Sequence, residues 1–201
     1  MHLLFHIVKG EVQMKNSTLQ EVLFLYKKQY GRMTVRAWLN MEMENSHPAF
    51  MVGGGILLLI AGLIVRFSVG GPYRVMMELG IADVVPPVWL MGILWSLSLF
   101  LIGCAAGFVL AYRPRGCEAE KYKGCMLFIL LSVLELCWYP AFFGAGLVFV
   151  SVLMSLLILC LSVWITGCFY RVTKLGGMLL LLHSVWLIYM VILHFIIFFR
   201  A

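Results

Sequence analysis

Charged residues are scarce in this sequence: they make up 12% of its 201 residues, whereas hydrophobic residues make up 63%. Soluble domains carry about a quarter charged and about half apolar residues, so this composition excludes an ordinary soluble domain and indicates a membrane protein. The sequence also lacks any CxxC pair, and five of its six cysteines lie in or beside uncharged runs. Cysteine in such runs acts as a small hydrophobe, so we expect neither a metal centre nor a disulfide framework.

Long uncharged runs provide enough sequence for five crossings of a bilayer, each of which needs about 20 mostly apolar residues. The run 124–170 contains a single charged residue, Glu135, and is too long for one crossing. We expect it to turn back at Gly144-Ala145-Gly146, because glycine tolerates the conformations of tight turns. The sequence therefore predicts an all-α integral membrane protein, a bundle of five transmembrane helices with spans near residues 49–67, 86–112, 124–143, 147–170 and 175–199.

Basic residues are unequally divided between the two sides that five spans define. Twelve of the 15 lysine and arginine residues fall in segments 1–48, 113–123 and 171–174, which lie on one side. Cytoplasmic loops carry the excess of lysine and arginine, so we predict the N-terminus inside and the C-terminus outside, in the plasma membrane if the source is bacterial. The same asymmetry explains the net charge of +6, and without an aromatic and basic platform we expect no nucleic-acid partner.

Residues 1–46 form a polar extension ahead of the transmembrane domain that we assign to residues 47–201. The start, MHLLFHIVKG, lacks the basic first residues and the long apolar core of a signal peptide. Three interpretations of the extension stay open. It is a helix on the inner membrane surface, a poorly ordered tail, or partly untranslated sequence before a true start at Met14.

Residues 66–83 make the only sizeable connection on the outer side. Gly70-Gly71-Pro72 indicates a turn, and the YRVMMELGIA segment that follows predicts a short helix over the bundle. We expect this loop to cover any pocket that opens outward. Pro86-Pro87 then begins the second span, because the amides of a first helical turn need no helical partner.

Tryptophans recur in the spans. Trp89 and Trp95 lie about 9 Å apart along a helix and point to different faces, so Trp95 is too deep to be an interface anchor. The rise of a helix places Trp95, Glu135, Trp138 and Trp186 in the middle layer of the membrane. Such a cluster of indoles suits a flat aromatic ligand, although aromatic rings inside a bundle also serve packing alone.

Ionisable residues in the spans are the second group of candidates. A carboxylate at the bilayer centre, such as Glu135, is usually protonated, paired or functional. Two interpretations of Glu135 stay open: a functional role, or a structural hydrogen bond. His183 and His194 lie about 16 Å apart on one helix face, which is too far for one shared metal ion. His194 lies nearer the outer mouth, with Met190 between it and Trp186. Each histidine is either a satisfied hydrogen-bonding group or, for His194, an axial ligand of haem.

Three motifs resemble those of the TspO/translocator family, also called tryptophan-rich sensory proteins or peripheral-type benzodiazepine receptors. They are PPVWLMGILWS followed by Gly103, LELCWYPAFFGAG in the third span, and FYRVTKLGGMLLLLHSVWLIY from the fourth to the fifth span. The resemblance covers about residues 49–200 and includes the number of spans. The sequence departs from that family's usual residues at positions that line or cover the pocket, namely Val75, Val84, Leu131, Glu135, Met154, Leu182, His183 and His194.

The resemblance implies a receptor or transporter that binds a hydrophobic planar ligand, a tetrapyrrole such as protoporphyrin or haem or a sterol-like molecule, and that forms homodimers. Trp95, Trp138 and Trp186 would stack on the ligand, and Glu135 and His194 would meet its polar edge. The full set of candidate ligand-binding residues is Trp89, Trp95, Glu135, Trp138, Trp186, Met190 and His194. We expect no required cofactor, no metal site and no catalytic residue.

Two other functions stay open. The same fold would support light- or oxygen-dependent breakdown of a porphyrin, with tryptophan as the electron donor. A small proton-coupled transporter that uses Glu135 as its proton carrier is the other alternative. Formation of a product from bound porphyrin distinguishes the first from simple binding, and a pH-dependent flux lost in Glu135→Gln would support the second.

Overall fold

The computed structural model of the chain describes residues 40, 43, 47–69, 73–78, 80, 85–112 and 116–200. The chain divides into two compact units, Met1–Met41 and Glu42–Ala201. The helices of the apolar bundle all belong to the second unit. The interpretations of the polar extension and of a start at Met14 lie outside the described residues. So does much of the outer connection, including the turn expected at residues 70–72.

The described residues form helices and no strand, and five of the helices are long and apolar enough to cross a membrane. This confirms the predicted all-α, five-span bundle. The spanning helices and the two short elements are α3 (Pro48–Val69), α4 (Tyr73–Glu78), α5 (Val88–Ala111), α6 (Glu118–Tyr139), the π-helical turn η1 (Pro140–Gly144), α7 (Val148–Val172) and α8 (Lys174–Arg200).

Proline and glycine set two of the helix boundaries. The amides of Leu90 and Met91 donate to the Pro87 carbonyl at 2.9 and 3.1 Å, so α5 begins directly after the proline pair. At the end of α6, Pro140 begins η1, and the Ala145 amide donates to the Pro140 carbonyl at 3.0 Å. Gly146 then takes a positive φ of 63°, which glycine adopts without steric cost, and the chain reverses into α7.

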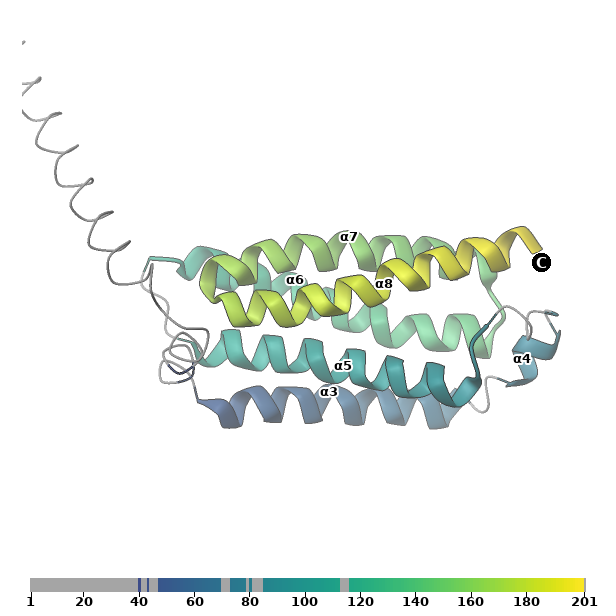
Figure 1. Ribbon diagram of the computed structural model, residues 1–201, viewed down its shortest axis with the longest axis horizontal. Helices are drawn as coiled ribbons and strands as arrows, with labels where there is room; N and C mark the ends of the chain where they lie inside the picture. Colours follow the sequence, from purple (N-terminus) through teal and green to yellow (C-terminus); the bar gives the residue numbers. More distant parts are fainter. Residues whose placement is uncertain are drawn as a thin grey trace, which may run out of the picture. The chain divides into compact units, whose positions relative to one another are not determined.

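Neighbouring helices run side by side along the bundle (Figure 1). The closest partners are α3 with α5, α7 with α8, α6 with α7, and α5 with α8. Figure 1 places α4 near the end of the bundle at which α8 ends. The short helix therefore lies at the end of the bundle that we predict to be the outer one.

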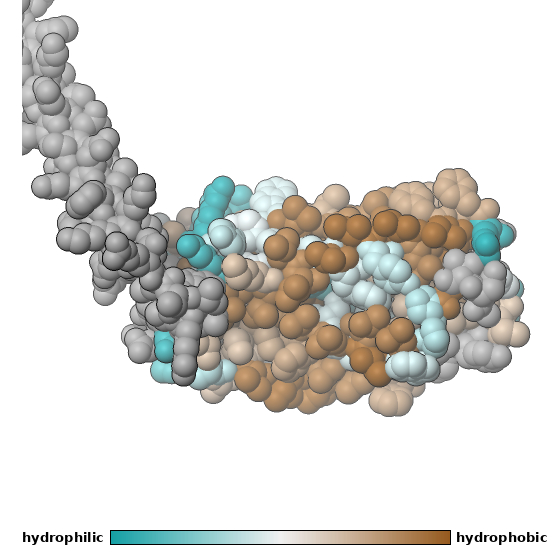
Figure 2. Space-filling view, viewed as in Figure 1, coloured by the Kyte–Doolittle hydropathy of each residue, from teal (hydrophilic) through white to brown (hydrophobic). Residues whose placement is uncertain are grey.

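Hydrophobic side chains cover most of the flank of the bundle seen in Figure 2, and the most strongly hydrophilic ones lie near its ends. Large apolar residues are exposed on the spanning helices, for example Leu57, Phe67 and Phe199. In water such a surface would be unfavourable, whereas hydrocarbon accepts it. The five apolar helices and this apolar surface are those of a multi-pass integral membrane protein.

Candidate ligand-binding site

Two adjoining cavities lie inside the bundle. The Arg66 cavity is lined by residues of α3, α4, α5, α6, η1 and α8, namely Arg66, Met76, Met91, Gly92, Trp95, Trp138, Tyr139, Phe143, Trp186 and Met190. The Glu135 cavity is lined by residues of α5, α6, α7 and α8, namely Trp95, Glu135, Trp138, Ser155, Ile158, Trp186, Leu187 and Met190. Four residues line both: Trp95, Trp138, Trp186 and Met190.

The four shared residues all belong to the ligand-binding set predicted from the sequence, and the structure brings them together as one wall. Trp95, Trp138 and Met190 are buried, and Trp186 is half-buried. Glu135, predicted to meet the polar edge of a ligand, lines one of the two cavities. Five of the seven candidate residues therefore share one location, and whether they bind a ligand stays a prediction.

His194 lies behind this wall. It is fully buried, its Nδ1 lies 2.6 Å from the Met190 carbonyl oxygen, and its ring packs edge-on against Trp138 and Phe142 at centroid distances of 5.2 and 5.0 Å. It is not among the residues that line either cavity. In this conformation His194 supports the tryptophan wall and is not placed to ligate a haem inside the cavities.

Trp89 lies apart from the other candidates. Its side chain is 65% exposed and lines neither cavity. Trp95 follows Trp89 by six positions in the helix, and at 100° per residue the two rings point to different faces. Because Trp95 faces the bundle interior, Trp89 faces outward.

The indole N–H groups of Trp95 and Trp138 have no hydrogen-bond acceptor among the described residues. Each side chain is only 4% exposed. Both rings are held by aromatic contacts, Trp95 to Tyr139 at 4.7 Å and Trp138 stacked on Phe142 at 5.8 Å between centroids. A buried donor without an acceptor costs about 1–3 kcal/mol. The wall is thus closely packed and incomplete in its hydrogen bonding.

Arg66 is a cavity residue that the sequence did not single out. It lies in the last turn of α3, and its side chain interacts with the Tyr139 hydroxyl. A Cβ atom at position 92 would collide with the Arg66 guanidinium, so Gly92 of α5 leaves the space that this group occupies. The result is a cation in the wall of an otherwise aromatic and thioether-lined cavity.

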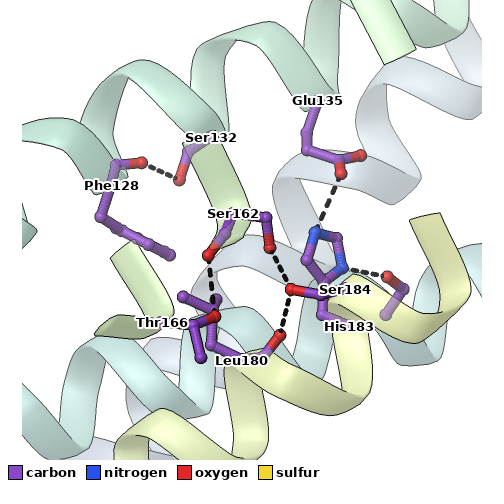
Figure 3. A network of polar contacts seen from close by, with 9 residues as sticks. Phe128, Ser132, Glu135, Ser162, Thr166, Leu180, His183 and Ser184 are labelled. Atoms are coloured by element: carbon purple, nitrogen blue, oxygen red, sulfur yellow. Dashed lines mark hydrogen bonds and ion pairs between the residues drawn. The ribbon is translucent and has the colours of Figure 1, made fainter. Parts of the chain in front are cut away.

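Ser98 of α5, His183 of α8 and Glu135 of α6 form a chain of three buried polar groups. Figure 3 shows the contact between His183 and Glu135. The Ser98 hydroxyl lies 2.6 Å from Nδ1 of His183, and Nε2 of His183 lies 3.2 Å from a carboxylate oxygen of Glu135. The second contact has ion-pair distance without the alignment of a hydrogen bond. The three side chains are 5%, 0% and 4% exposed. Glu135 is therefore paired, as a carboxylate inside a membrane requires.

The order serine, histidine, carboxylate is also that of hydrolytic triads. Here, however, Ser98 lines neither cavity, and Glu135 is the member of the chain that does. A nucleophile must reach its substrate, so this geometry does not favour acyl transfer. It presents a carboxylate to the cavity and keeps the hydroxyl behind the imidazole.

The space inside the two cavities is small. The volume open to the centre of a water molecule is about 20 Å³ in the Arg66 cavity and about 10 Å³ in the Glu135 cavity. By this measure one water needs about 10–15 Å³. A tetrapyrrole or a sterol therefore enters only if side chains of the walls move. Among the described residues, no group of three histidine, cysteine or acidic side chains could hold a metal ion.

The sequence was compared with family models, curated proteins and solved structures. The family model described as TspO/MBR family matches residues 55–200, from within α3 to the end of α8. No curated protein and no solved structure matched. The family match covers well over half of the chain and confirms the resemblance carried by the three motifs. Membership of this family supports a function of the receptor or transporter kind. The chain belongs to the TspO/MBR family and, with its five apolar helices, is a multi-pass membrane protein.

Proposed function

We propose that the protein binds a planar hydrophobic ligand with acidic groups, a tetrapyrrole such as protoporphyrin or haem, against Trp95, Trp138 and Trp186. The observation that carries this proposal is the pair of buried indole N–H donors in the wall shared by both cavities. An acceptor on the ligand would satisfy donors that the protein leaves unpaired. The flat faces of the three indoles match a flat ring system.

Arg66 supports the acidic part of the proposal. A guanidinium binds a carboxylate with two parallel hydrogen bonds. The guanidinium of Arg66 lies in the wall of the Arg66 cavity. A tetrapyrrole carries its carboxylates on one edge of the ring. That edge would face Arg66 while the ring lies along the tryptophan wall.

Three methionines make enlargement of the Arg66 cavity feasible. Met76 of α4, Met91 of α5 and Met190 of α8 all line it. Methionine is unbranched and flexible, so its side chain moves aside with less strain than an aromatic or branched residue. Met76 belongs to the segment 66–83, so displacement of α4 would open the cavity at the end of the bundle where a lid is predicted.

Ligand binding is tested on the purified protein in detergent with protoporphyrin and with haem. The dissociation constant is read from the absorption band of the ligand, because tryptophan fluorescence also changes when tryptophans are removed. We expect saturable binding that weakens at least about tenfold in a Trp95→Phe/Trp138→Phe variant, which corresponds to about 1.4 kcal/mol. A Trp89→Phe/Trp164→Phe variant is the matched control, because these two rings are 65% and 56% exposed.

The role of Arg66 is tested with protoporphyrin and its dimethyl ester. The acid should bind the wild-type protein more tightly than the ester, and Arg66→Gln should remove most of that difference. Absence of saturable tetrapyrrole binding, or equal binding in the two tryptophan variants, would refute the proposal. Displacement by a sterol with no effect of Arg66→Gln would favour the sterol-like alternative.

Three further expectations stay predictions. A porphyrin-degrading activity would appear in the same assay as loss of the ligand band and growth of a product band under light and oxygen. The homodimer and the orientation with the N-terminus inside are proposals for the same protein in membranes. Crosslinking tests the homodimer, and chemical accessibility of Lys121 and Lys123 on the predicted inner side tests the orientation.

A further inference from the structure

We propose that the Ser98–His183–Glu135 chain is a proton-binding site, and that its charge controls the affinity of the adjoining cavity for an acidic ligand. The proton site stands on the geometry of the three side chains alone. Its control over ligand affinity rests on the proposed function.

Burial of the Glu135–His183 pair favours a shared proton. The two side chains are 4% and 0% exposed, and they lie on different helices, α6 and α8. A single uncompensated charge at this depth is costly, whereas a carboxylate beside an imidazole can share one proton and remain neutral as a pair. The hydroxyl of Ser98, 2.6 Å from Nδ1, holds the imidazole with Nε2 towards Glu135.

The size of the Glu135 cavity limits what can reach the carboxylate. About 10 Å³ is open there to the centre of a water molecule, which is the threshold for a single water. No group larger than water fits in this space unless side chains of its wall move. With the side chains of the wall in these positions, the species that Glu135 can exchange with this space is therefore a proton.

The surroundings of the carboxylate leave His183 as its titratable partner. Of the described side chains that line the Glu135 cavity, the other polar ones are Ser155 of α7 and the indoles of Trp95, Trp138 and Trp186. Ser155 donates to the Val152 carbonyl at 2.8 Å and carries no charge. His183 from α8 is thus the titratable group in contact with Glu135. Arg66 of α3 and Tyr139 of α6 line the adjoining Arg66 cavity, and His194 of α8 is bonded to Met190 behind the wall.

Counting protons gives the sign of the coupling. With one proton the pair is neutral, with two it carries a charge of +1, and with none it carries −1. The two cavities share four residues, so an anionic ligand in the first lies near this charge. The ligand favours the doubly protonated pair, and by reciprocity protonation favours the ligand. Binding should take up a proton, and affinity should rise as pH falls.

The proton site is tested first on the protein without ligand. Infrared difference spectra between pH values report the C=O band of a protonated carboxyl group, and subtraction of the Glu135→Gln spectra isolates Glu135. We expect a titrating band that vanishes in Glu135→Gln and shifts its midpoint in His183→Gln. It should be unchanged in Ser184→Ala, a control next to His183 whose hydroxyl pairs with Ser162 at 2.8 Å. If no Glu135 band titrates while the protein remains folded, the proton site is refuted.

The coupling is tested by measuring the dissociation constants of protoporphyrin and of its uncharged dimethyl ester over the pH range in which the carboxylates of protoporphyrin stay ionised. One linked proton lowers the constant for the acid by up to about tenfold for each unit of falling pH. The ester should show no such slope, and Glu135→Gln should abolish it for the acid. Binding with equal slopes for acid and ester would overturn the coupling. A titrating Glu135 without tetrapyrrole binding would keep the proton site and refute the proposed function.

Discussion

Two regions of the bundle are packed in opposite ways. One is the contact between α3 and α5, and the other is the junction of α5, α6 and α8. Between α3 and α5 the backbones touch: a Cβ atom at Gly103 would collide with the Gly54 carbonyl, and one at Gly107 with the Phe50 carbonyl. At the junction, by contrast, bulky rings and the Ser98–His183–Glu135 chain fill the space between the helices, and several buried polar atoms have no hydrogen-bond partner among the described residues.

The difference indicates that the α3–α5 contact serves stability and that the junction suits a binding site. Helices in a membrane associate through close packing and hydrogen bonds, because lipid offers no hydrophobic driving force between them. At Gly54, Gly103 and Gly107 the α3–α5 contact is close packing of backbone against backbone. The junction accepts the cost of a buried ion pair and of unpaired indole donors, which is typical of a site that a ligand or a proton completes.

The largest expected effect comes from breaking the junction at its ion pair. His183→Ala should lower the free energy of unfolding by about 3–5 kcal/mol, because it leaves the buried Glu135 carboxylate without its partner. The Glu135→Leu/His183→Leu double variant should be much less destabilised, since two apolar side chains replace both charges. Thermal unfolding in detergent measures both. A double variant as unstable as His183→Ala would show that the pair contributes net stability beyond compensating its own burial.

Breaking the α3–α5 contact should have the next largest effect. Gly103→Ala places a methyl group against the Gly54 backbone, and overpacking of this kind costs about 1–3 kcal/mol. For a chain of this size each kcal/mol lowers the unfolding temperature by about 2–4 °C.

Gly53→Ala is the matched control, because a Cβ there has no neighbour within 4 Å. Alanine in a helix interior is favoured over glycine by about 0.5–1 kcal/mol, so this variant should be slightly stabilised. Equal stabilisation of the two variants would mean that helix propensity, rather than contact between α3 and α5, decides the outcome.

Most of the fold could be predicted because its signals are local. Uncharged runs set the spans, Pro86-Pro87 sets the start of α5, and the glycines after Pro140 set the reversal before α7. Depth along each helix follows from a fixed rise, so the sequence places Trp95, Trp138 and Trp186 at one level, and they do line one wall.

The pairings inside the site could not be predicted in the same way. Depth counted from the ends of the runs puts His183 about 6 Å below Glu135, yet the two side chains are 3.2 Å apart. The axial offset and tilt of α6 against α8 arise from packing, which one helix's sequence does not encode. From the sequence, Arg66 is only one of the basic residues counted to predict the orientation in the membrane. The space that Gly92 leaves for its side chain depends on how α3 packs against α5. A paired carboxylate is predictable for Glu135, but its partner is not.

The smallest expected effect on stability comes from the incomplete hydrogen bonding of the junction. Trp138→Phe removes an indole N–H that has no acceptor among the described residues, and it also removes some packing. The loss of packing destabilises the fold, whereas removal of an unpaired donor recovers about 1–3 kcal/mol, so the net change should stay within about 1 kcal/mol.

Phe142→Leu is the matched control for Trp138→Phe, because it also shrinks a buried ring of the same stack without removing a polar group. It should lower the unfolding temperature more than Trp138→Phe does, although both substitutions remove the same number of non-hydrogen atoms. The reverse order would mean that the Trp138 N–H has an acceptor in the folded protein, and the wall would then be complete without a ligand. With the expected order, the junction holds a buried donor that lowers the stability of the fold, which is the property that distinguishes it from the α3–α5 contact.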